Sequence, residues 1–142
     1  MFSRLTFATL ALFIAGLFGA TQAQEKGSKV LAKGEFHNAD KAGKGTATVY
    51  QLADGKRVLR LSNFATDNGP DLHVRLIAAD DARDTASVAK AQFVELAKLK
   101  GNKGNQNYDV SKDVDLSKYK VVSIWCNRFS VNFAAAPLKV VK

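Results

Sequence analysis

The sequence predicts an all-β domain: an antiparallel sandwich or barrel-like fold with short hairpins and little helix. From residue 29 onward, short apolar runs alternate with turn residues, and no stretch before Ala86 keeps helical periodicity. Strands that follow one another in quick succession favour a sandwich or a barrel. The chain shows no internal repeat and no second domain, and its length suffices to bury a core without disulfide bonds.

The N-terminal residues have the pattern of a secretory signal. Arg4 supplies a positive charge, residues 5–18 are apolar and uncharged, and Thr21-Gln22-Ala23 provides small residues at a cleavage site. We expect a signal peptide over residues 1–23, a polar N-terminal segment over 24–33 and the β domain over 34–142. The alternative is an uncleaved anchor, but the apolar run is shorter than the roughly 20 residues of a spanning helix. The expected location is therefore periplasmic or extracellular, with no transmembrane anchor after cleavage.

The first half of the domain contains two clear turn signals. Asp54-Gly55 is a strong hairpin signal between β-rich runs over 46–52 and 57–64, after a strand that begins at 34–37 and a turn at 39–45. Asp67-Asn68-Gly69-Pro70 is the second turn, and the strand at 71–78 follows it. This strand alternates, so Leu72, Val74 and Leu76 share one face while Asp71, His73 and Arg75 share the other.

The second half continues in the same way. We expect an acidic loop over 79–85, at most one helical turn over 86–91, and a strand over 93–99. A glycine-containing loop over 101–105 precedes a short extended segment at 107–110, and residues 114–119 lead into the last two strands.

Cys126 is the only cysteine and the main candidate for a functional residue. Exported proteins normally pair their cysteines, so a lone one is either a buried apolar filler or a thiol kept for chemistry. If Asn127-Arg128 is a two-residue turn, Cys126 lies opposite Phe129 on an apolar core face, with Trp125 on the other face. A bulge would instead rotate the thiol outward, and Arg128 would lower its pKa if the guanidinium returned over the sulfur.

His37 and His73 complete the set of candidate ligands. Two histidines and one thiolate could bind copper, and the same set could hold zinc or haem. However, no second histidine follows Cys126 closely, and strand alternation turns His73 away from the apolar face to which Cys126 belongs. We therefore assign no metal site. The chain also lacks CxxC, CxxCH, GxSxG and HExxH motifs.

The net charge of +8 favours acidic partners: an acidic redox protein or an anionic component of the cell envelope. The lysines are scattered and no nucleic-acid motif is present, so we expect no nucleic-acid partner. A thiol on the core side of a hairpin does not readily cross-link two chains, and we expect a monomer.

Several segments together resemble the DM-thirteen domain, also called the electron-transfer DM-thirteen, an all-β module associated with DOMON domains. The resemblance covers residues 34–138 as a single domain, and its most specific parts are Gly69-Pro70-Asp71-Leu72, Leu99-Lys100-Gly101 and Trp125-Cys126-x-x-Phe129. The chain departs from the usual pattern at Ala97 and Ala134, where glycine is common.

The resemblance implies an extracytoplasmic module whose cysteine, here Cys126, is redox-active as a bare thiol or as a ligand to a prosthetic group. Haem is the group that the resemblance suggests; copper is less favoured, and His37 is a secondary candidate. Two hypotheses follow. The first is a small redox module that finds its electron partner in trans. The second is a binding or structural module in which Cys126 is core packing.

Overall fold

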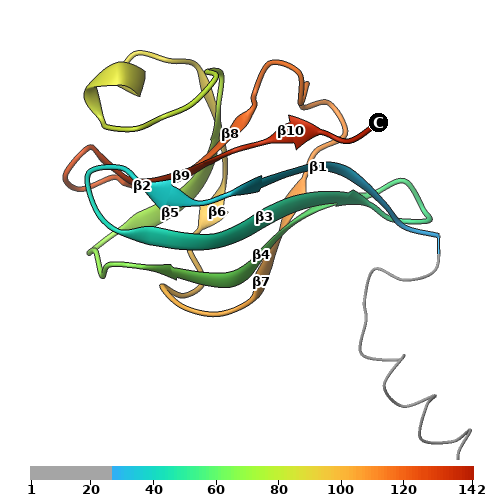
Figure 1. Cartoon of the computed structure of the whole chain (residues 1–142), viewed down its shortest axis with the longest axis horizontal. Coiled ribbons are helices and arrows are strands. Elements are labelled where there is room, and N and C mark those ends of the chain that lie inside the picture. Colours follow the sequence, from blue (N-terminus) through green and yellow to red (C-terminus); the bar gives the residue numbers. More distant parts are fainter. Residues whose placement is uncertain (1–26) are drawn as a thin grey trace, which may run out of the picture.

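The computed structural model describes residues 27–142, so the predicted signal peptide and its cleavage site lie outside the described residues. Two antiparallel five-stranded sheets pack face to face, which confirms the predicted β-sandwich (Figure 1). The first sheet has the order β10-β1-β3-β4-β7, and the second has the order β2-β9-β8-β5-β6. The strand bounds are β1 Lys29–Glu35, β2 His37–Asn38, β3 Gly43–Gln51, β4 Arg57–Thr66, β5 Leu72–Ile77, β6 Phe93–Lys98, β7 Gln106–Val110, β8 Val121–Cys126, β9 Val131–Pro137 and β10 Lys139–Val140.

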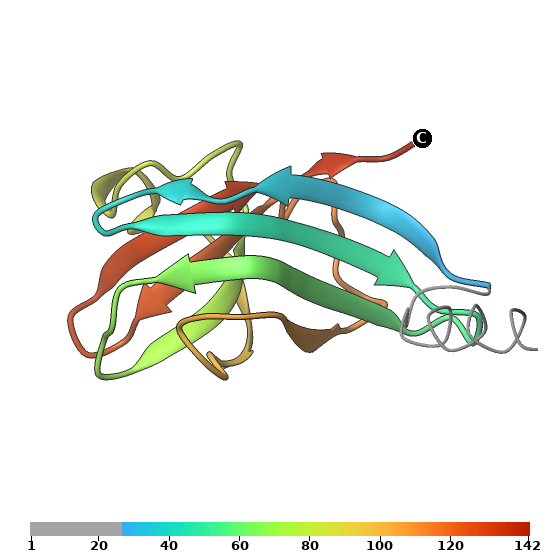
Figure 2. The same ribbon diagram turned by 60° about the horizontal axis from the view of Figure 1, so that its bottom comes forward.

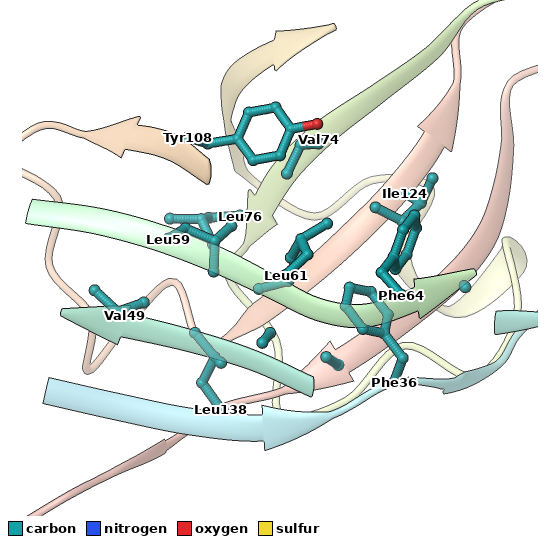
Figure 3. Packing of buried hydrophobic residues seen from close by; sticks show 14 of the residues in the cluster. Phe36, Val49, Leu59, Leu61, Phe64, Val74, Leu76, Tyr108, Ile124 and Leu138 are labelled. Carbon is teal, nitrogen blue, oxygen red and sulfur yellow. The ribbon is translucent and has the colours of Figure 1, made fainter. Parts of the chain in front are cut away.

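The core lies between the two sheets and follows from strand alternation. In the first sheet, register partners on four neighbouring strands form one buried row: Ala32, Val49, Leu59 and Tyr108. The second sheet opposes it with fully buried side chains that include Val74, Leu76 and Ile124. Figure 3 shows these side chains directed into the space between the layers. Alternating apolar residues thus fix which face of each sheet is buried.

The hairpin predicted at Asp54-Gly55 is confirmed. β3 and β4 pair from Gln51↔Arg57 onward, and the carboxylate of Asp54 accepts a hydrogen bond from the amide of Lys56 at 2.9 Å. Gly55 adopts a φ of 91°, which a residue with a side chain rarely tolerates.

The strand at the start of the domain is longer than expected. β1 begins at Lys29, inside the segment 24–33 that we expected to precede the domain, and β10 near the C-terminus was not foreseen. β1 pairs with β3 along its length and with β10 at Ala32 and Lys33. These partners are distant in sequence, so a local pattern of polar residues gives no sign of the pairing.

A long loop covers part of the outer face of the second sheet. Residues 78–92 contain only a short 3-10 helix, η2 (Ala86–Val88), and they pack Ala82 and Val88 against Ile77 and Trp125. Buried Asn132 fastens the loop, because its side-chain amide donates to the carbonyls of Ala82 and Asp84 at 3.2 and 3.3 Å. Within residues 27–142, no helix is long and apolar enough to cross a bilayer.

Candidate functional site

Cys126 ends strand β8 on the core side of the second sheet and is completely buried, with 0% of its surface exposed. It is a free thiol. Its cross-strand partners are Leu72 on β5 and Val131 on β9. The predicted core-face orientation is correct, and the thiol is not rotated outward.

The hairpin that follows Cys126 differs from the predicted two-residue turn. Cys126 pairs with Val131 rather than with Phe129, so the loop contains four residues, 127–130. Ser130 has a φ of 54°, and a register shift follows between Ile124 and Trp125. Asn-Arg lacks the glycine that a tight two-residue turn favours, and the chain uses a longer loop instead.

The longer loop changes the surroundings predicted for the thiol. Phe129 was expected on the core face but is 59% exposed, and Arg128 is exposed as well. Neither residue therefore belongs to the buried surroundings of Cys126. The core position opposite Cys126 is occupied by Val131, which packs against the main core cluster.

Leu72 separates Cys126 from a surface cavity. This cavity has a volume of about 240 Å³ and is lined by residues 68–72, 98–99 and 101–102. Leu72 is 9% exposed and lies directly opposite Cys126, at the separation at which cross-strand side chains touch. The leucine side chain thus stands between the open cavity and the thiol.

The Leu72 side chain can occupy this position because Gly69 has no side chain. A Cβ at Gly69 would lie 2.8 Å from Leu72 Cδ2 and 3.0 Å from two ring atoms of Phe133. Any larger residue would therefore displace Leu72 or Phe133. The sequence contained a signal for this arrangement, because Gly69-Pro70 was recognised as a turn, but the contact with Phe133 arises only in the folded chain.

Hydrogen bonds hold the loop on the other side of the cavity. The side chain of Gln106 donates to the carbonyls of Gly101 and Gly104 at 3.0 and 3.1 Å, and the Tyr108 hydroxyl donates to Gln106 Oε1 at 2.5 Å. The same hydroxyl accepts from the amide of Lys100 at 2.8 Å. Burial raises the pKa of Tyr108, and the bond from Lys100 offsets part of the rise. The loop is thus a defined wall of the cavity.

Trp125 and His73 lie on the opposite face of the second sheet, as predicted. They are register partners, and both are buried. The ring nitrogens of His73 lie 2.8 Å from Asp71 Oδ1 and 3.0 Å from Glu95 Oε2. These two contacts hold the imidazole ring between β5 and β6.

Arg75 lies beside this pair, between two aromatic rings. Its guanidinium carbon is 3.7 Å from the Phe93 ring centroid and 4.6 Å from that of Trp125. Partial burial lowers the pKa of Arg75, and the charge of Glu95 acts in the opposite direction. Arg75 thus lies between the buried ring of Trp125 and the ring of Phe93, which is 47% exposed.

His37 is engaged elsewhere. It lies on the edge strand β2, and its Nε2 is 2.7 Å from Asp81 Oδ1. Burial works to raise the pKa of Asp81, but the hydrogen bonds from His37 and Ala82, with the charges of His37 and Arg83, hold it below its ordinary value. The interaction links β2 to the long loop.

The structure does not bring the candidate ligands together. His73 and Cys126 lie on opposite faces of the second sheet, and His37 is bound to Asp81. Across residues 27–142, no group of three or more His, Cys, Asp and Glu side chains is arranged to hold a metal ion. The residues present also do not fit a haem at Cys126, because the thiol is enclosed and Leu72 stands between it and the cavity.

The three most specific segments of the resemblance meet at this end of the sandwich. Leu72 pairs with Cys126, its carbonyl accepts from the amide of Leu99 at 2.8 Å, and the amide of Asn127 donates to the carbonyl of Asp71 at 2.9 Å. These contacts join the Gly-Pro-Asp-Leu turn, the Leu-Lys-Gly loop and the cysteine hairpin. The fold and the site define a small all-β module with one enclosed thiol beneath a cavity.

The family of the chain is shown by comparison with known proteins. The family model described as electron transfer DM13 matches residues 35–138, which is most of the chain. The chain belongs to the electron transfer DM13 family, which confirms the resemblance found in the sequence. No match was found among curated proteins or among solved structures.

One departure from the family pattern is accommodated directly. The Cβ of Ala134 occupies space next to Gly43, because a Cβ added to Gly43 would lie only 2.2 Å from it. Ala134 is fully buried and pairs with Ile124. The absence of a side chain at Gly43 on β3 thus leaves room for the Ala134 methyl group.

Proposed function

We propose that the protein is an exported electron-transfer module in which the Cys126 thiol is the redox group and an acidic partner protein supplies the second reactant. Membership of the electron transfer DM13 family supports an electron-transfer role for the module. The observation that carries the proposal is the convergence of the three resemblance segments on the end of the sandwich where Cys126 lies.

The chemistry open to a single thiol is exchange with a disulfide of the partner. Cys126 gives up its proton to solvent, its sulfur bonds to one sulfur of the partner's disulfide, and the other sulfur leaves as a thiolate. Cys126 is then part of a mixed disulfide with the partner, and two small-molecule thiols complete the transfer. The first attacks the Cys126 sulfur, releases the partner's second thiolate and leaves Cys126 in a mixed disulfide with the small thiol. The second attacks that disulfide, restores the Cys126 thiolate and leaves as the disulfide of the small thiol, so the partner's disulfide has gained two electrons from the two small thiols.

Access to the thiol requires a local opening. Cys126 is fully buried, and Leu72 lies between it and the cavity lined by residues 68–72, 98–99 and 101–102. Displacement of the Leu72 side chain is the smallest movement that would expose the sulfur at this end. The module is then redox-active only while the Leu72 side chain is displaced.

The second candidate is a binding module in which Cys126 is core packing. Its complete burial among apolar residues supports this function, since buried free cysteines in such surroundings are commonly inert. The two functions differ in one measurable property: whether the thiol of the folded protein reacts.

The test is the rate at which a small aromatic disulfide forms a mixed disulfide with the folded protein, followed by intact mass. Hydrogen exchange of the Ile124 amide in the same buffer gives the free energy of global opening, and a Cys126→Ala variant gives the background. This free energy and the rate of a fully exposed thiol together give the modification rate expected for global opening alone. Modification much faster than this expected rate supports the redox module. Modification no faster than it identifies the cysteine as core packing.

A second measurement addresses a prosthetic group. The protein is expressed with its own signal in a host supplied with haem and copper, purified, and its visible spectrum is recorded before and after dithionite. Under the thiol proposal the spectrum is featureless. An absorption band that is lost in Cys126→Ala would replace the thiol mechanism with ligation of a cofactor.

A further inference from the structure

The outer face of the first sheet carries a row of polar side chains across four strands. Lys33, Thr48, Arg60 and Asn107 are register partners on β1, β3, β4 and β7. The adjacent residues on each strand (Ala32, Val49, Leu59 and Tyr108) form the buried row described above. Because side chains alternate along a strand, the polar row therefore points away from the core. Figure 2 shows β1, β3 and β4 side by side at the front of the sandwich.

Asn107 positions two cations on this face. Its side-chain oxygen accepts from Arg60 Nη1 at 3.1 Å, and its backbone carbonyl accepts from Lys100 Nζ at 2.6 Å. The ammonium of Lys100 also lies 5.1 Å from the centroid of the Tyr108 ring. Both cations are therefore held in place before any ligand binds, which lowers the entropic cost of binding.

A second cationic position lies toward the other end of β4. Ala65 pairs with Lys44 on β3 and forms an isolated bridge with Lys103, so a small residue separates two exposed lysines. Two open grooves, of about 330 and 490 Å³, are both lined by these three residues. Together they form one depression that crosses the sheet between the lysines.

The charges on this face are unbalanced. Within residues 27–142, no ion pair is formed by any of its cations: Lys33, Lys44, Arg60, Lys100 and Lys103. Three carboxylates lie nearby: Glu35 accepts from the Thr46 hydroxyl, Asp67 accepts from the amide of Ala42 at 3.4 Å, and Asp109 is exposed on the same face of β7 as Asn107. Five cations against three carboxylates leave a net positive charge, so the face is complementary to a negatively charged partner.

The shape and composition of the face indicate which kind of anion fits. The two cationic positions are five residues apart on β4, or about 16 Å at the usual rise of a strand, so a small anion can reach only one of them. The exposed large hydrophobic residues in the described part of the chain are Phe93, Phe129, Val140 and Val141, and none belongs to this face. A folded protein partner needs apolar anchors of that kind.

We propose that this face binds a carboxylated linear polysaccharide, with one acidic sugar at Arg60 and Lys100 and another in the depression between Lys44 and Lys103. The choice of a glycan rests on the exported location proposed above, but it does not depend on Cys126. The open groove suits an extended chain, and the fixed cations suit carboxylates spaced along it.

The test is titration of the protein with alginate oligomers of increasing length at low ionic strength. Affinity rises with length, mannuronate monomer does not bind measurably, and added salt weakens binding. The double variant Lys44→Gln/Lys103→Gln weakens binding by roughly tenfold. The matched double variant Lys90→Gln/Lys118→Gln removes the same charge from exposed positions elsewhere and leaves affinity within about twofold of wild type.

Three results would overturn the proposal: no length-dependent binding, equal losses in the two double variants, or tighter binding to anionic lipid vesicles than to the oligomers. Cys126→Ala separates this inference from the proposed function. It retains full alginate binding whether or not the thiol proves reactive.

Discussion

Leu72 is predicted to control the reactivity of Cys126, and replacing it with alanine tests this directly. Leu72 lies opposite Cys126 and also lines the cavity, so its removal shortens the path from solvent to the sulfur. Leu76 provides the matched control. It is on the same strand and the same face, is fully buried, and pairs with Val122 away from the thiol.

The two variants differ in a way that separates local from global opening. Leu76 is 0% exposed and Leu72 is 9% exposed beside a cavity, so we expect losses of about 3–4 kcal/mol for Leu76→Ala and about 2–3 kcal/mol for Leu72→Ala. If the thiol reacts only after global unfolding, these losses accelerate modification by roughly a thousandfold and a hundredfold, respectively. If local displacement of the cover governs access, Leu72→Ala is the faster of the two.

The assay combines denaturant unfolding of each variant with the modification rate of Cys126 in native buffer. We expect Leu72→Ala to react faster than Leu76→Ala despite being the more stable protein. The reverse order, with both rates following the measured stabilities, would refute the role of Leu72 as a cover. A variant that fails to fold is recognised by its unfolding curve, and Leu72→Val then serves as the milder replacement.

Three further predictions concern the parts around the site. Gly69→Ala places a methyl group against the Phe133 ring and lowers the free energy of unfolding by about 1–3 kcal/mol, measured in urea. Asn132→Ala leaves the buried Ser123 hydroxyl and two loop carbonyls without their partner, so stability falls by about 3 kcal/mol and amides of residues 78–92 exchange faster. The raised pKa of Tyr108 means that its neutral phenol stabilises the fold fully below pH 10 and that this contribution is lost as pH rises through the folded value. Tyr108→Phe therefore makes the loss of stability above pH 10 less steep in pH-dependent urea unfolding.

The first two of these have a control within the chain. Gly101→Ala adds a methyl group whose nearest neighbour is 3.6 Å away, so it should cost less than Gly69→Ala; an equal cost would contradict the crowding at Gly69. Asn68→Ala removes an exposed asparagine with one side-chain bond and should leave loop exchange unchanged. For the third, the wild type is the reference: if Tyr108→Phe keeps the wild-type slope at high pH, another group is responsible.

The local pattern predicted the fold class and most strand positions because burial between two sheets imposes alternation. The faces of β5 and β8 were correct, including the core-side position of Cys126 and the opposite position of His73. The Asp54-Gly55 hairpin was also correct, since its turn chemistry is contained within a few residues.

The register of the cysteine hairpin could not be predicted from the local sequence. A two-residue and a four-residue loop both keep Cys126 and Val131 on the core face, so alternation could not choose between them, and Phe129 was wrongly placed opposite Cys126. The register then shifts by one more residue between Trp125 and Ile124, so that Ile124 pairs with Ala134. Such adjustments depend on packing against the facing sheet, which the sequence of the hairpin does not contain.

The sequence alone therefore determined the family, the all-β class and the buried faces of β5 and β8, because these depend on residue type and on the period of two. Tertiary structure decided the rest: the pairing of β1 with β10, the engagement of His37 by Asp81, and the enclosure of Cys126 beneath Leu72. Each of these joins residues far apart along the chain, and only the packing of two sheets brings such residues into contact.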